Sequence, residues 1–229
     1  MSTDEEKKQI VSSSLIAVGI VAILWIVKLA EEILGVSLSF FGLLPLKAEG
    51  LKGILFSPLL HGGYKHLISN SIPLFLLSAA LFYYYRKKAW QIFILSWLIT
   101  GIWVWLFARG NSYHIGASGV VYSLTAYHFV SGIIRKEPRL IAFSLLVTFL
   151  YGSFVWGIFP AFSPGERISW ESHLMGTIAG IILAFGYRDV GPQRKVYEWP
   201  DEDENENEED PTNISGESQQ QYTSTSTSE

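Results

Sequence analysis

The feature that most constrains this chain is a series of long apolar stretches separated by short charged loops. The stretches are Ile10 to Leu34, His66 to Tyr85, Trp90 to Phe107, Ile115 to Ile134, Leu140 to Pro160 and His173 to Tyr187. Most of them approach the ~20 residues that a helix needs to cross a hydrocarbon core of ~30 Å. Since a single chain segment can satisfy its backbone hydrogen bonds in lipid only as a helix, the pattern predicts an all-α polytopic membrane protein with six transmembrane helices.

The charges divide the chain into an apolar body and a polar tail. Residues 1–197 hold all 17 basic residues and ten of the 21 acidic ones, and the remaining eleven acidic residues follow from Glu198 onward. A tail of this composition buries too little apolar surface to fold. We therefore expect a cytoplasmic N-terminus over residues 1–9, a membrane domain over residues 10–188, and an acidic disordered tail over residues 189–229 with an unknown partner. The basic charge forms no stripe or face, so nucleic acid is not an expected partner.

The basic residues also predict the orientation in the membrane. Eleven of the 17 lie before the first stretch or after the second, fourth or sixth, namely Lys7, Lys8, Arg86, Lys87, Lys88, Arg135, Lys136, Arg139, Arg188, Arg194 and Lys195. By the positive-inside rule, these loops and both termini face the cytoplasm. No cleavable signal is predicted, because the first stretch is too long for a signal core and no A-x-A site follows it. We expect a multi-pass protein of the lipid bilayer, in a bacterial inner membrane.

Polar side chains on three different stretches lie at one depth. Ser118 is about 26 Å from Arg135, and His173 is about 22 Å from Arg188, at 1.5 Å per helical residue. Asn70 and His66 are about 24 and 30 Å from Arg86 by the same rise. Buried polar groups in membrane helices are functional candidates. Their common level predicts one site close to the extracytoplasmic surface.

The residue types at this level are those of acyl transfer. A serine hydroxyl becomes a good nucleophile when a neighbouring histidine takes its proton, and Ser118 and His173 can form that pair. Asn70 and His66 share a helix face and can donate hydrogen bonds to a developing oxyanion. Glu171 is expected in the loop before His173, so the prediction is a Ser-His dyad without a buried acid. The chain contains no cysteine, and neither a metal nor an organic cofactor is expected.

Small residues near the dyad predict close helix packing. Gly119, Gly176 and Gly180 would let the fourth and sixth stretches touch, and Gly176-x-x-x-Gly180 is a packing pattern of membrane helices. Each residue taken alone also has a structural explanation. A serine between glycines is more often a packing residue, and a histidine at a helix end often lies at the interface. The coincidence of all of them at one depth favours a site.

Three segments of the sequence resemble the rhomboid intramembrane serine proteases. Gly116-Ala117-Ser118-Gly119, with Tyr122 four residues after the serine, is similar to the G-x-S-G segment of that family. The run from His173 to Gly180 is similar to its H-x-x-G-x-x-x-G segment, and the run from His61 to Asn70 to the start of its second helix. The segments occur in the family's order, and the resemblance covers roughly residues 10–188.

The resemblance implies a fold, an activity and roles. The fold is a six-transmembrane-helix rhomboid-like bundle, and the activity is that of an endopeptidase that cleaves membrane-anchored substrates in or near their transmembrane segments. Ser118 would be the nucleophile and His173 the base. His66, Asn70 and the backbone N–H of Ser118 would form the oxyanion hole, and Tyr122 would support the His173 ring. The implied substrate entrance involves residues 140–160 and the loop 161–172.

One departure and two alternative functions stay open. Many family members carry a Trp-Arg pair in the loop after the first helix, where this chain has Lys52-Gly53. A catalytically silent relative that binds membrane clients is one alternative, although such relatives typically lack the serine or the histidine. A small transporter is another, but it would need ionisable residues along a pathway through the membrane rather than at one depth.

Overall fold

The computed structural model describes residues 3–110, 112–150 and 169–191. Within these ranges the chain forms seven α-helices and no strand. The helices are α1 (Thr3–Leu34), α2 (Gly53–Phe56), α3 (Tyr64–Tyr85), α4 (Ala89–Phe107), α5 (Ser118–Arg135), α6 (Pro138–Leu150) and α7 (Trp170–Gly186). Short 3₁₀ turns occur at Ser39–Phe41, Ala48–Gly50 and Ser57–Leu59. Residues 151–168 and residues 192–229, which include most of the acidic tail, lie outside the described residues.

Three described helices are long and apolar enough to cross a membrane, α1, α3 and α4. The integral-membrane prediction is confirmed at this level, whereas the count of six spans stays a prediction. α7 has 17 residues, and the described part of α6 is short. α5 is long enough but carries several polar residues, which it can do because α3, α4, α6 and α7 surround it with protein instead of lipid.

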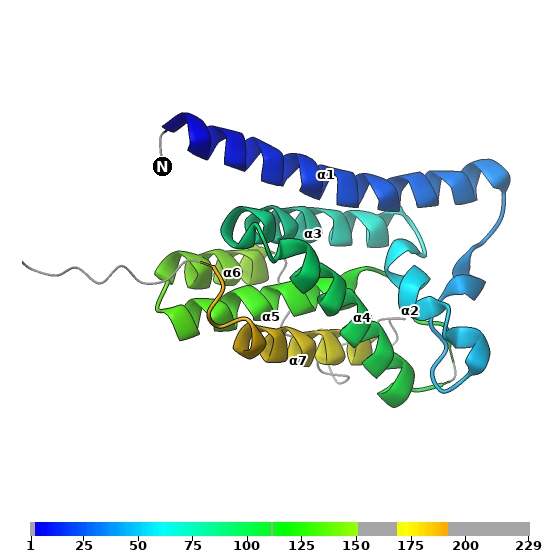
Figure 1. Cartoon of the computed structure of the whole chain (residues 1–229). Helices are drawn as coiled ribbons and strands as arrows, with labels where there is room; N and C mark the ends of the chain where they lie inside the picture. The colour runs from blue at the N-terminus through cyan, green and yellow to red at the C-terminus, as the bar shows by residue number, and fades with distance from the viewer. Residues whose placement is uncertain (1–2, 111, 151–168, 192–229) are drawn as a thin grey trace, which may run out of the picture. The chain divides into compact units, whose positions relative to one another are not determined.

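α1 lies along α3, as the dark blue and teal helices of Figure 1 show. Polar contacts hold both ends of this pair: Gln9 Nε2 donates to the Tyr83 carbonyl at 2.6 Å, and Trp25 Nε1 donates to Ser71 Oγ at 3.1 Å. The other sides of α1 present apolar residues outward, among them Leu15, Ile26 and Ile33. A helix that is apolar around most of its circumference is typical of a membrane span.

The segment between α1 and α3 is bound to α4. Trp97 Nε1 donates to the Ile54 carbonyl and Trp105 Nε1 to the Lys47 carbonyl, each at 3.0 Å. The Lys52 Nζ lies 5.0 and 4.9 Å from the ring centres of Phe40 and Phe41, which is cation–π distance. These contacts anchor the loop at the position where many rhomboid proteins have a Trp-Arg pair.

Gly53 stands where many rhomboid proteins have the arginine of the Trp-Arg pair, and close packing requires glycine there. A Cβ at this position would lie 2.2 Å from the backbone of Leu43, so the turn of α2 can approach it only with glycine. Leu43 also pairs with His114 in an isolated antiparallel bridge. The loop after α1 is thereby connected to the segment that leads into α5.

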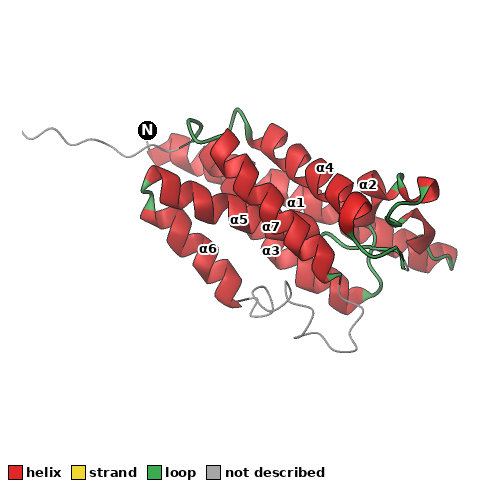
Figure 2. Cartoon of the chain, turned by 90° about the horizontal axis from the view of Figure 1, so that it is seen from below, coloured by secondary structure: helices red, strands yellow, loops and turns green. Residues whose placement is uncertain are grey.

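α5 and α7 run side by side, with α6 next to α5 (Figure 2). The backbones touch at two glycines: a Cβ at Gly176 would be 2.1 Å from the Gly119 carbonyl oxygen, and a Cβ at Gly180 2.0 Å from that of Ser123. Small residues that let backbones approach are the usual means of packing helices in membranes. This contact determines how far apart the side chains of α5 and α7 lie.

Candidate active site

Ser118 and His173 form a hydrogen-bonded pair. The His173 Nε2 lies 3.0 Å from the Ser118 Oγ, within the reach of a base that removes a hydroxyl proton. Ser118 is the first residue of α5, and His173 lies in the first turn of α7 and is buried. The structure thus brings the two residues together from positions 55 apart in the chain.

The turn before Ser118 requires glycine. Gly116 has φ +114°, which residues with a side chain rarely adopt. A Cβ at this position would also lie 2.6 Å from the His66 ring. Gly116 therefore allows the chain to turn into α5 directly against His66.

Tyr122, one turn into α5, lies flat on the His173 ring. The two ring centres are 4.1 Å apart and the planes differ by 10°, which is a stacked arrangement. Tyr122 is itself 5% exposed, so the packed helices around it hold its ring in place. A stacked, buried neighbour restricts rotation of the imidazole and keeps Nε2 directed at Ser118.

His66 and Asn70 come to the same turn from α3. The Asn70 Nδ2 donates to the His66 carbonyl at 2.9 Å, a bond that uses one of the two amide hydrogens. The same nitrogen lies 3.8 Å from the position a Cβ would take on Gly116. The first N–H groups of α5 have no acceptor within the helix. Donors from α3 and from the start of α5 therefore meet beside Ser118, where an oxyanion would need them.

His61 lies next to His66 with its ring 5.0 Å away and edge-on. Its Nδ1 donates to the Leu59 carbonyl at 3.4 Å, and the ring is 2% exposed. Burial, together with the neighbouring His66, lowers the pKa of His61 to about 4. His61 is therefore neutral near pH 7 and supports His66 as an uncharged neighbour.

The position expected for Glu171 was wrong. α7 begins at Trp170, three residues before His173, because the Ser169 side chain accepts a hydrogen bond from the Ser172 N–H and caps the helix. Glu171 consequently lies in the first turn of α7 and is 3% exposed. Its Oε1 forms an ion pair with Arg109 Nε. The carboxylate is thus buried near the dyad and is bound to a cation from the loop before α5.

The sequence places His61 and His114 near the mouth of the site without a chemical role, and the structure shows what His114 contacts. The residue is 8% exposed and lies within hydrogen-bonding distance of Ser169 and of the Arg109 carbonyl. Its position four residues before Ser118 is visible in the sequence, but nothing there indicates that Arg109 and His114 contact the start of α7. Among the described residues no group of three or more His, Cys, Asp or Glu side chains is arranged to hold a metal ion.

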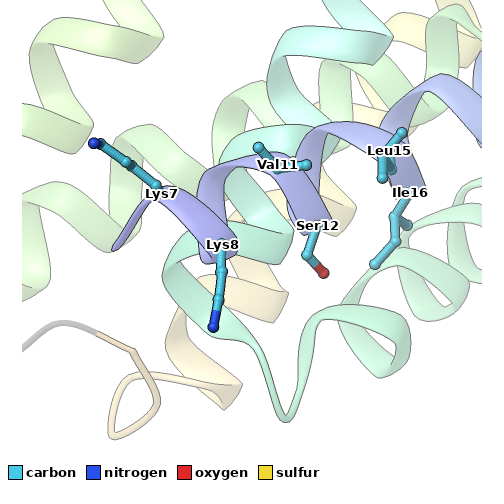
Figure 3. Close-up of a pocket in the computed structure, with 6 residues that line it drawn as sticks. All are labelled: Lys7, Lys8, Val11, Ser12, Leu15 and Ile16. Carbon is cyan, nitrogen blue, oxygen red and sulfur yellow. The ribbon is translucent and has the colours of Figure 1, made fainter. Parts of the chain in front are cut away.

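A shallow groove lies elsewhere, on the first turns of α1 (Figure 3). It is lined by Lys7, Lys8, Val11, Ser12, Leu15 and Ile16. Gln9 binds the last turns of α3, whereas His66 lies in its first turn. The groove is therefore at the opposite end of α3 from the dyad and is no part of the candidate site.

Comparison with known sequences identifies the family. The Rhomboid domain matches residues 48–189, which include α2 to α7 and with them Ser118, Tyr122, His173, His66 and Asn70. The chain belongs to the rhomboid family. Rhomboid proteins are integral membrane proteins, and the family is one of serine proteases that act on membrane proteins within the bilayer.

Individual relatives agree with this assignment. An uncharacterized protein of Mycobacterium tuberculosis is 33% identical over 180 residues, which cover 76% of this chain and 74% of the relative. An uncharacterized protein of Mycobacterium leprae is 32% identical over 180 residues, or 76% of this chain and 70% of the relative. A Bacillus subtilis protein named "Putative rhomboid protease YdcA" is 26% identical over 138 residues, or 56% of this chain and 62% of the relative.

Proposed function

We propose that this chain is an intramembrane serine endopeptidase that cleaves peptide bonds in or near the transmembrane segments of membrane-anchored proteins. The observation that carries the proposal is the 3.0 Å separation between Ser118 Oγ and His173 Nε2. The stacked Tyr122 and the glycine contacts between α5 and α7 support it, because they hold this separation. Membership of the rhomboid family supplies the reaction class.

The proposed reaction uses the dyad twice. His173 takes the Ser118 proton as Oγ attacks the scissile carbonyl, and the imidazolium then gives this proton to the departing amine. The resulting ester on Ser118 is hydrolysed when His173 removes a proton from water and returns it to Ser118 Oγ. Each tetrahedral intermediate carries an oxyanion, which His66, Asn70 and the Ser118 N–H would stabilise. No step requires a metal or an organic cofactor.

The proposal includes a topology. Six transmembrane helices would form the membrane domain of residues 10–188, with both termini in the cytoplasm of a bacterium and the dyad close to the opposite surface. The acidic tail of residues 189–229 would be cytoplasmic. The substrate entrance proposed for residues 140–172 lies largely outside the described residues.

The test is cleavage by purified protein in detergent or liposomes, with a transmembrane-segment substrate analysed by mass spectrometry. We expect cleavage and fluorophosphonate labelling of Ser118, both abolished in Ser118→Ala and His173→Ala. Ser123→Ala is the matched control, since it removes a buried hydroxyl from the same helix one turn and a half away. Absence of labelling and cleavage in the wild type would overturn the proposal. Client binding that is unchanged in both dyad variants would then favour a silent rhomboid.

A further inference from the structure

The loop that leads into α5 is bound to the first turn of α7 by side chains. Arg109 pairs with Glu171, and its guanidinium lies 5.7 Å from the centre of the Trp170 ring. The His114 Nδ1 lies 2.5 Å from the Ser169 Oγ. Two residues of the loop thus contact three successive residues at the start of α7.

The hydrogen-bond directions in this cluster follow from its chemistry. The His114 Nε2 lies 3.2 Å from the Arg109 carbonyl, which only accepts, so Nε2 carries a hydrogen. In the neutral ring, Nδ1 is then an acceptor, and the Ser169 hydroxyl donates to it. The Ser172 Oγ lies 2.6 Å from the Ser169 Oγ and donates to it in turn. The result is a directed chain from Ser172 through Ser169 to His114.

The backbone around His114 is held independently of this chain. The His114 N–H donates to the Leu43 carbonyl at 2.8 Å, and the Leu43 N–H donates to the His114 carbonyl at 3.0 Å. Two residues later, the Gly116 N–H donates to the Ser57 carbonyl at 2.8 Å. The backbone of His114 is therefore fixed, and hydrogen bonds from its ring can hold the start of α7 in one position.

The Ser172 end of this hydrogen-bonded chain adjoins the dyad. Ser172 directly precedes His173, and its carbonyl oxygen would be 3.3 Å from a Cβ at Gly119, the residue after Ser118. The tightest backbone contacts between α5 and α7, at Gly176 and Gly180, lie further along α7 than His173. The chain through His114 therefore holds the other side, where the helices begin.

We propose that His114 is a positioning residue, which sets the distance between His173 and Ser118 by binding the N-terminal cap of α7 through Ser169 and Ser172. The inference rests on the proposed protease function and adds a residue that does not touch the substrate. Removing the ring's hydrogen bonds would let the start of α7 rotate or shift while the glycine contacts persist. A small misplacement of a catalytic base reduces the rate of the chemical step far more than it reduces substrate binding.

The test compares His114→Leu, His114→Gln and Ser169→Ala with the wild type. We expect His114→Leu to lower kcat roughly 10- to 100-fold, with KM within about twofold. His114→Gln keeps a donor and an acceptor and should recover part of the loss. The double variant His114→Leu/Ser169→Ala should be no worse than the poorer single variant, because both remove the same link. Tyr113→Leu, at the adjacent and 40% exposed position, is the matched control and should retain wild-type kcat.

The outcomes separate this inference from the proposed function. A wild-type protein that neither cleaves nor labels overturns the proposed function and this inference with it. A wild type that cleaves, with His114→Leu and Ser169→Ala at the same kcat, overturns the inference alone. A fall in kcat that His114→Gln fails to restore and that matches a fall in melting temperature also overturns it, since packing would then explain the loss. Ser169→Ala provides the test if His114→Leu does not fold.

Discussion

At the scale of single residues, the contact of the Tyr122 ring with His173 can be changed without altering the nucleophile or the base. The ring stacks on His173 at 4.1 Å without lying between the nucleophile and the base. We expect Tyr122→Leu to lower kcat by roughly 2- to 10-fold, the range that corresponds to an aromatic contact of about 0.5–1.5 kcal/mol. Tyr122→Phe keeps the stack and should stay within about threefold of the wild type. Equal loss in both variants would show that the hydroxyl, not the ring face, matters.

His61 gives the site a pH-dependent stability. Its pKa is about 4 in the folded protein and about 6.5 when exposed, so between these values the unfolded state binds a proton that the folded state does not. The free energy of unfolding should therefore fall as the pH drops from about 6.5 to 4, with a contribution of about 3 kcal/mol from this residue.

The measurement is an unfolding titration in mixed detergent micelles at pH 7 and pH 4.5. Because other groups in the protein can also change protonation between these two pH values, the informative quantity is the difference between the wild type and His61→Gln. The variant should lose less stability between the two pH values. An equal loss in both proteins would mean that His61 is protonated without cost.

The residues of the candidate site could be selected from the sequence because their chemistry is unusual in an apolar background. Ser118, His173, His66 and Asn70 are recognisable from residue type and helical spacing alone. Arg135 shows the limit of that reasoning. It is one of the eleven basic residues used to predict orientation, yet it is 4% exposed and donates to the carbonyls of Tyr187 and Val190. Which charges enter a helix bundle depends on tertiary contacts.

At the scale of elements, the contact between α5 and α7 sets the geometry of the dyad. We expect Gly176→Ala to separate the two helices, because the added methyl would lie 2.1 Å from the Gly119 carbonyl oxygen. The cost of such overpacking is typically about 1–3 kcal/mol. Cleavage should fall together with the melting temperature, since both depend on the same contact.

Gly186→Ala is the matched control for this prediction. It adds the same methyl group to the last turn of α7, where nothing lies within 4 Å. It should leave the melting temperature and kcat unchanged. A stable, active Gly176→Ala would contradict the view that backbone contact between α5 and α7 determines the distance from His173 to Ser118.

The element boundaries show why the sequence predicted the helices better than their ends. The apolar runs locate the helices, but α7 starts earlier than His173 and α1 starts at Thr3, in a polar segment. Capping by Ser169 and the hydrogen bond from Tyr83 to Glu6 favour these extensions. Both extensions depend on contacts between polar groups, which a hydropathy pattern does not contain. The cap at Ser169 places Glu171 inside α7, where it is buried.

At the scale of the whole molecule, the hydropathy of a helix indicates how much of its surface faces lipid, and not whether the helix is part of the bundle. α1 and α4 are apolar because much of their surface faces outward, whereas α5 carries Ser123, His128 and Ser131 because other helices cover it. The sequence could therefore predict an all-helical membrane protein with a site inside it. The number of spans is harder to predict, because α5 carries polar residues and because α7 and the described part of α6 are short.

The charge distribution predicts the orientation of the protein in the membrane. This prediction is simple to test because the sequence contains no cysteine. Because the chain contains no native cysteine, each single-cysteine variant reports one position. Lys87→Cys lies in the exposed loop after α3, and Tyr113→Cys lies in the loop before α5. With basic loops in the cytoplasm, a membrane-impermeant thiol reagent on intact bacteria should label Tyr113→Cys and leave Lys87→Cys unlabelled until the cells are opened. The reverse labelling pattern would place the Ser118–His173 pair at the cytoplasmic side. The water for hydrolysis would then come from the cytoplasm, and the cleaved bonds would lie near that side of the membrane.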